Sequence, residues 1–137
     1  MKFIPTEEKL IERVKELRCL YEISKTISWA NGIEKQVFKK IISSTKKAWK
    51  YSLDAKVEIE IPDYAILPLD SGEQTVCQIS AITISDATIG FIKVHYPENK
   101  FTAYDFLREE QQLLDTIAFE IGNYIEKYQN LEKKRRL

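Results

Sequence analysis

The stretch QTVCQISAITISDATIGFIKVHYP, residues 74–97, decides the fold of this chain. Two runs rich in β-branched residues flank a turn signal at Asp86-Ala87-Thr88, and apolar residues alternate with others through the second run. Pro97 ends the second run, because proline has no N–H to extend an interior ladder. The stretch therefore predicts an antiparallel hairpin over residues 74–96.

Further strands are predicted before this hairpin. Residues 56–61 alternate charged with apolar side chains, which is the pattern of a strand with one buried face. Pro62-Asp63 then predicts a turn, residues 64–69 a second strand, and residues 70–72 another turn. We therefore expect about four antiparallel strands between residues 56 and 96.

Segments with helical periodicity precede and follow these strands. Apolar residues recur three and four positions apart, and this spacing predicts helices over residues 6–28, 32–51 and 104–134. Asn31 is placed to cap the middle helix, with Glu34 three residues later completing a capping-box-like start. Trp29 and Trp49 lie near predicted helix ends, and we expect both at the edge of the core. The alternative is that they line a ligand cavity.

This order of elements predicts one α+β domain over residues 1–137. Runs of helix, then strand, then helix favour two packed layers over alternating βαβ units. We expect an antiparallel sheet that is covered on one face by the N- and C-terminal helices.

Charge and hydropathy narrow the classes of partner. The 21 basic and 21 acidic residues give a formal net charge of +0, without the basic surplus that phosphate contacts require, so we do not expect nucleic-acid binding. No apolar run approaches the ~20 residues of a membrane span, and the N-terminus lacks a signal-peptide core. These features favour a cytoplasmic protein, in which Cys19 and Cys77 are expected as buried thiols.

Residues able to support catalysis are sparse. His95 is the single histidine, no G-x-S-x-G elbow is present, and the four glycines form no phosphate loop. We therefore expect no enzyme activity, no metal and no cofactor. Alternation places Phe91, Lys93 and His95 on one strand face, where they are candidates to contact an unidentified small molecule. The alternative is that they form an ordinary strand surface.

A heptad seam marks the last predicted helix. Its apolar positions repeat as in helices that pair along their length, and the helix is long enough to overshoot strands of ordinary length. The first helix carries a matching stripe, so we expect two copies to form a parallel four-helix bundle. Alternatively, both stripes pack only on the sheet of their own chain. The expected interface residues are Leu10, Val14, Leu17, Tyr21, Ile117, Ile121, Tyr124, Tyr128 and Leu131.

Four motifs resemble a known family. ELRCLYEISKTI, residues 16–27, and FLREEQQLLDTIAFEIGNYIE, residues 106–126, resemble the opening and closing helices of GAF-like input domains of microbial sensor histidine kinases. AWKY, residues 48–51, and IGFIKVHYP, residues 89–97, resemble the end of the second helix and the hairpin strand of that family. The chain differs at Lys93, where an acidic residue is common, and at His95, where an aromatic residue is common.

The resemblance implies a GAF-like fold and a role in sensing or signal relay in a two-component system. It implies no catalytic residue, because these input domains are not themselves the kinase. The implied partners are a second copy of the chain and an output kinase domain or another protein. The alternative is a ligand-free module for dimerisation or protein interaction.

Overall fold

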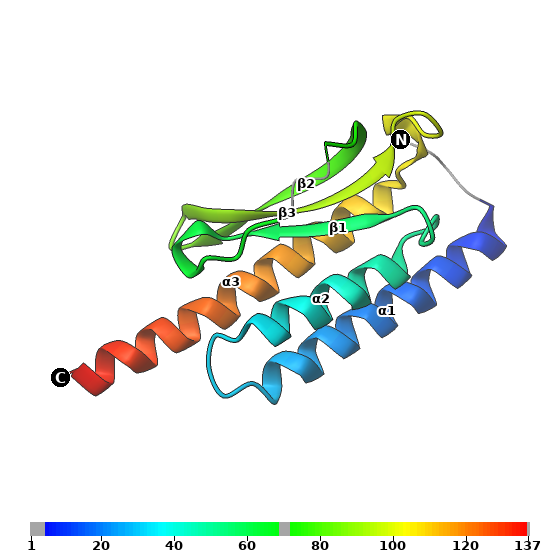
Figure 1. The fold of residues 1–137 in the computed structure, drawn as a ribbon. Helices are drawn as coiled ribbons and strands as arrows, with labels where there is room; N and C mark the ends of the chain where they lie inside the picture. The colour runs from blue at the N-terminus through cyan, green and yellow to red at the C-terminus, as the bar shows by residue number, and fades with distance from the viewer. Residues whose placement is uncertain (1–4, 69–71, 137) are drawn as a thin grey trace.

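The computed structural model describes residues 5–68 and 72–136 and contains three helices and a three-stranded antiparallel sheet (Figure 1). The chain begins with α1 (Thr6–Ser28) and α2 (Lys35–Ala48), continues through β1 (Lys56–Glu60), and forms the hairpin β2 (Thr75–Ile84) and β3 (Ala87–Pro97). Helix α3 (Arg108–Arg136) ends it. Short 3₁₀ helices η1 (Pro62–Tyr64) and η2 (Ala103–Asp105) lie in the connections. The α+β prediction is confirmed.

The hairpin predicted from residues 74–96 is also confirmed. Strand β3 lies in the centre of the sheet and pairs antiparallel with β1 on one side and β2 on the other. The turn is formed by Ser85 and Asp86, whose φ angles of 50° and 66° are both positive, as a two-residue turn between twisted strands requires. It lies earlier than the predicted turn at Asp86-Ala87-Thr88, because Ala87 and Thr88 already belong to β3. A register shift between Ile82 and Thr83 marks a bulge shortly before this turn.

The strand predicted over residues 64–69 is wrong. Pro62–Tyr64 forms η1, Ala65 adopts a left-handed φ of 56°, and only Ile66 pairs with Ile61. Pro68 has no N–H for a ladder. The chain therefore leaves β1 after a single bridge, and Leu69 lies outside the described residues.

All three helices lie on one side of the sheet (Figure 1). Helix α2 contacts β1, α3 contacts β2 and β3, and α1 packs mainly on α2 while also touching α3. A Cβ atom at Gly122 of α3 would lie 2.5 Å from the carbonyl oxygen of Thr83, so glycine permits the close approach of α3 to β2. The N- and C-terminal helices thus share one side of the sheet, with α1 seated on the other two helices.

Three predicted helix boundaries move inward. The middle helix spans 35–48 instead of 32–51, because Trp49 leaves the helical conformation with ψ of 147°. The prediction that Asn31 caps this helix is wrong, because the helix starts after Glu34, which is the N-cap residue and forms no side-chain capping bond. Of the predicted capping box only one hydrogen bond is present, from the Asn31 N–H to Glu34 Oε1 at 3.1 Å. The last helix starts at Arg108 instead of residue 104, after the separate 3₁₀ turn η2.

A buried polar junction ties the end of α2 to the sheet and to the start of α3. The indole of Trp49, fully buried rather than at the core edge, donates to Gln78 Oε1 at 3.0 Å. The Glu110 carboxylate accepts the backbone N–H of Leu107 at 2.7 Å and that of Lys50 at 2.8 Å. The junction satisfies backbone groups at a corner and a helix start that would otherwise be buried without partners.

Candidate functional site

The outward face of α1 carries a stripe of large apolar side chains where a solvated helix face would be polar. Leu10, Val14, Leu17 and Tyr21 are 65%, 56%, 51% and 66% exposed. They recur at steps of four, three and four and lie opposite Cys19, which packs into the core. A contiguous stripe of large apolar side chains on a monomer surface marks an interaction site more often than solvated surface.

The matching seam predicted on α3 does not face outward. Ile117, Ile121 and Tyr124 are between 0% and 2% exposed, because α3 lies between the sheet and α1 and uses these positions for the core of its own chain. They are therefore unavailable to a second copy, and a bundle built from both seams is wrong for these residues. Leu131 is 42% exposed.

Two tyrosines instead fasten the α1–α2 connection to α3. The Tyr124 hydroxyl accepts the N–H of Glu34 at 3.0 Å and donates to the carbonyl of Gly32 at 2.5 Å. The Tyr128 hydroxyl donates to the carbonyl of Ala30 at 2.6 Å. The connection therefore packs on the part of α3 that was expected to be an uncovered overhang.

The predicted ligand face lies on the side of the sheet away from the helices. Phe91, Lys93 and His95 are partly exposed and alternate with the buried residues of β3, as predicted. His95 Nδ1 lies 2.7 Å from Thr75 Oγ1, and His95 Nε2 lies 3.1 Å from Glu58 Oε2. One histidine thus bridges all three strands, which the sequence did not reveal because the strand register sets both contacts.

The threonine, histidine and carboxylate form a hydrogen-bonded row: His95 Nε2–H donates to the Glu58 carboxylate, which can only accept, and in the neutral imidazole Nδ1 then accepts from the Thr75 hydroxyl. Lys56 Nζ lies 3.4 Å from Glu58 Oε1, so the carboxylate already has two cationic or hydrogen-bonding neighbours. Among the described residues, no group of three or more His, Cys, Asp and Glu side chains is placed to hold a metal ion. His95 is partly buried because it contacts side chains of both neighbouring strands across the sheet.

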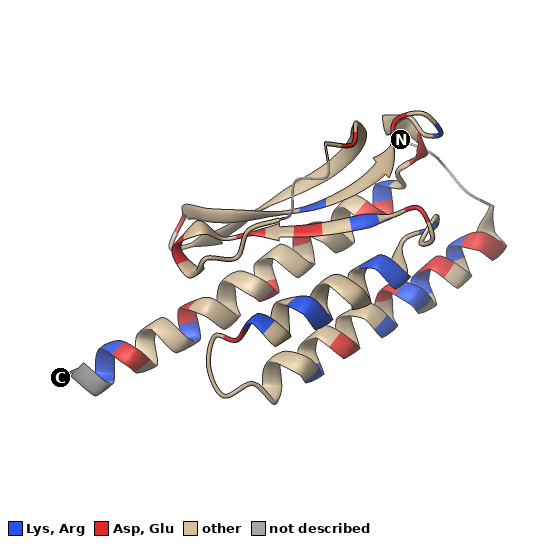
Figure 2. Ribbon diagram, viewed as in Figure 1, with Lys and Arg blue, Asp and Glu red and all other residues tan. Residues whose placement is uncertain are grey.

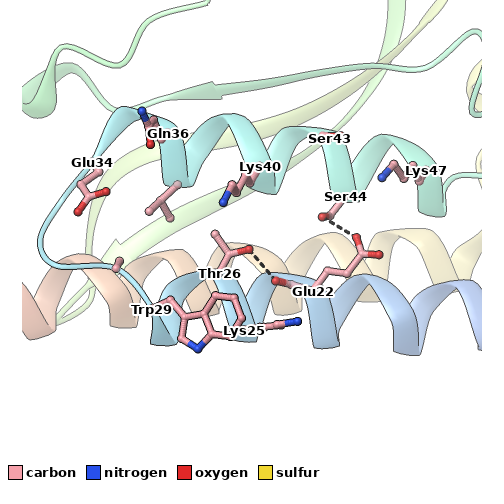
Figure 3. A pocket seen from close by; sticks show the side chains of 12 residues that line it. Glu22, Lys25, Thr26, Trp29, Glu34, Gln36, Lys40, Ser43, Ser44 and Lys47 are labelled. Carbon is pink, nitrogen blue, oxygen red and sulfur yellow. Dashed lines mark hydrogen bonds between the residues drawn. The ribbon is translucent and has the colours of Figure 1, made fainter.

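A polar groove of about 350 Å³ lies between α1 and α2 (Figure 3). Glu22 accepts a 2.8 Å hydrogen bond from Ser44 across the groove, and Lys25 lies 4.7 Å from the ring centroid of Trp29. Trp29 is 72% exposed, so its expected place at the core edge is wrong. Because the groove joins side chains of both charge signs, it presents no single ligand chemistry.

The two cysteines have different environments. Cys19 is buried between α1 and α2, and desolvation raises the pKa of its thiol to about 12, with Glu22 adding to the rise. Cys77 is exposed on the outer sheet face, so its expected burial is wrong. It lies directly across from His95 in the β2–β3 register.

The comparisons with known proteins give no family assignment. Neither a scan against protein-family models nor a search of curated proteins finds a match for this chain. In the described part of the chain, every helix is too short or too polar to cross a membrane.

Proposed function

We propose that this chain is a non-catalytic, GAF-like regulatory domain that forms a homodimer through the outward face of α1. A role as a cytoplasmic input domain that passes a signal to an output kinase rests on the sequence resemblance. The three-helix, three-strand antiparallel architecture is compatible with that resemblance. The apolar stripe of α1 carries the proposal, because no other element of the described chain covers it.

A second copy fits the stripe for a geometric reason. Leu10, Val14, Leu17 and Tyr21 occupy alternating d and a positions of a heptad, and these are the positions through which two helices pair. The same helix can therefore supply both surfaces. A two-fold axis then closes the pair and leaves no unpaired copy of the stripe.

In this account α3 supplies the connection to an output element. It runs in the same direction as α1 and continues past the sheet at its C-terminal end (Figure 1). A rotation of the paired α1 helices would act on α3 through their direct contact. If a small molecule takes part, the face with Phe91, Lys93 and His95 remains its proposed position.

Charge beside the stripe favours a second candidate function, a ligand-free dimerisation module. In a parallel pair, Arg13 at position g would face Arg18 at position e of the second copy, and like charges repel. In an antiparallel pair, Leu10 faces Tyr21 and Val14 faces Leu17, while Arg13 faces Leu20. The C-terminal ends of the two α3 helices would then point apart, which suits a module without paired outputs.

Cysteine cross-linking separates the two orientations. In a chain with Cys19→Ser and Cys77→Ser, a parallel pair brings two copies of Leu10→Cys together and yields a disulfide-linked dimer on mild oxidation. An antiparallel pair yields the dimer only when Leu10→Cys chains are mixed with Tyr21→Cys chains. The first result supports the input domain, and the second supports the dimerisation module.

A charge substitution tests the interface itself. Leu17→Glu places a carboxylate against an apolar side chain in each half of the pair. We therefore expect the dimer to be weaker by at least about 2 kcal/mol, which raises its dissociation constant roughly 30-fold. The matched control is Leu53→Glu, because Leu53 is 95% exposed and lies off α1. Light scattering after size exclusion should show a monomer for the first variant only. Equal masses for the two variants would reject the α1 interface.

A further inference from the structure

Strand β1 is an edge strand with one open side. Within residues 5–68 and 72–136 its ladder partner is β3 alone, and on its other side the Ile61 N–H donates to Ile66 O at 2.7 Å while the Ile66 N–H donates to Ile61 O at 3.2 Å. Successive residues of a strand direct their backbone groups to opposite edges. The backbone groups of Val57 and Ile59 therefore point to the same open side as those of Ile61. No described residue forms a backbone hydrogen bond with them there.

A groove of about 420 Å³ follows this open edge. Its walls are β1, one face of α2, and residues 65–68, which leave β1 after the Ile61–Ile66 bridge. Side chains of a strand added beside β1 would alternate between the floor of this groove and the outer face of the sheet. Apolar side chains form most of the floor and walls: Phe38, Ile42, Val57, Ile59, Ile66 and Leu67.

The rim of the groove is basic. Helix α2 carries five lysines and no acidic residue (Figure 2). Lys35 and Lys39, one turn apart on this helix, lie at the groove, and neither forms an ion pair with a described residue. Lys56 also lines the groove but is already paired with Glu58. An occupant that carries negative charge would complement this rim.

We propose that this groove binds an extended, acidic peptide segment of a partner protein, which adds to the sheet as a strand beside β1. Its backbone would pair with Val57 and Ile59, its apolar side chains at alternate positions would contact Phe38 and Ile42, and its carboxylates would lie near Lys35 and Lys39. Main-chain pairing supplies affinity and the alternate pockets supply selectivity in this mode of recognition. The proposal does not depend on dimerisation through α1.

The test uses the whole chain and a fluorescein-labelled peptide of sequence Glu-Leu-Thr-Leu-Thr-Leu-Glu, followed by fluorescence anisotropy. We expect saturable binding with a dissociation constant below roughly 100 µM. Lys39→Glu and Leu67→Glu both change exposed side chains and should each weaken binding about tenfold. Leu53→Glu, an exposed leucine outside the groove, should leave it unchanged.

A second peptide tests the strand pairing. Methylation of the backbone nitrogens that face β1 removes the donors needed by the open edge and should abolish binding. Equal binding of the methylated peptide, together with displacement by dodecanoate, would show that the groove takes a small amphiphile and would overturn the proposal. Absence of binding by the unmodified peptide, or binding that Lys39→Glu and Leu67→Glu leave unchanged, would also overturn it.

Discussion

Glu110 gives the chain a pH-dependent stability that can be calculated from the structure. The side chain is 3% exposed, and desolvation raises the pKa of its carboxyl from 4.5 to about 7 despite hydrogen bonds from the backbone N–H groups of Leu107 and Lys50. Repulsion from Glu12 adds to the rise, and Lys15 opposes it. The folded chain therefore binds a proton over a pH range in which the unfolded chain has released it.

The sign and size of the effect follow from this linkage. The contribution of Glu110 to the free energy of unfolding is fully present below pH 4.5 and is lost as the pH rises through about 7, because the folded chain must then hold an ionised carboxylate in a buried position. The loss amounts to about 3 kcal/mol at most, which corresponds to roughly 10 °C in melting temperature for a domain of this size.

Thermal melts followed by circular dichroism at pH 5 and pH 8 measure this difference. The unaltered chain should melt at a lower temperature at pH 8, and Glu110→Gln should remove most of the difference because the amide does not ionise. Glu109→Gln, a change of the neighbouring and partly exposed carboxyl, should retain it. If Glu110→Gln melts with the same pH dependence as the unaltered chain, the assignment of the effect to Glu110 is refuted.

Two further substitutions test the packing of α3. Gly122→Ala places a Cβ atom 2.5 Å from the carbonyl oxygen of Thr83 and should destabilise the chain by about 1–3 kcal/mol in urea denaturation, whereas Asn123→Ala at the next, exposed position should change stability little. Tyr128→Phe removes the hydrogen bond to Ala30 O, so hydrogen exchange in residues 29–34 should accelerate by up to about tenfold while exchange in the sheet stays unchanged. Uniform acceleration across the chain would contradict a local fastening role for Tyr128.

The sequence predicted the elements with strong periodicity. The bounds of the first helix, the β2–β3 hairpin and the outward placement of Lys93 follow from local alternation and spacing, which do not depend on tertiary contacts. The extra strand failed because Pro62 and the left-handed Ala65 turn the chain into a 3₁₀ helix. Local β-propensity over residues 64–69 did not overcome that geometry.

The sequence predicted the apolar stripes of the candidate site but not which of them faces outward. Both helices carry a helical apolar stripe in the sequence, and periodicity alone cannot say which stripe faces the chain's own core. The layer order decides it, because α3 lies against the sheet and buries Ile117, whereas α1 lies outside and exposes Leu17. The row from Thr75 through His95 to Glu58 depends on the register of three strands, which no local pattern contains.

Sedimentation equilibrium of the unaltered chain tests the central claim, dimerisation through α1, most directly. The account predicts a mass twice the 16.0 kDa of one chain at roughly 100 µM, with dissociation on dilution. A mass of 16.0 kDa throughout this range would contradict the account, since the exposed stripe of α1 would then have no second copy to cover it.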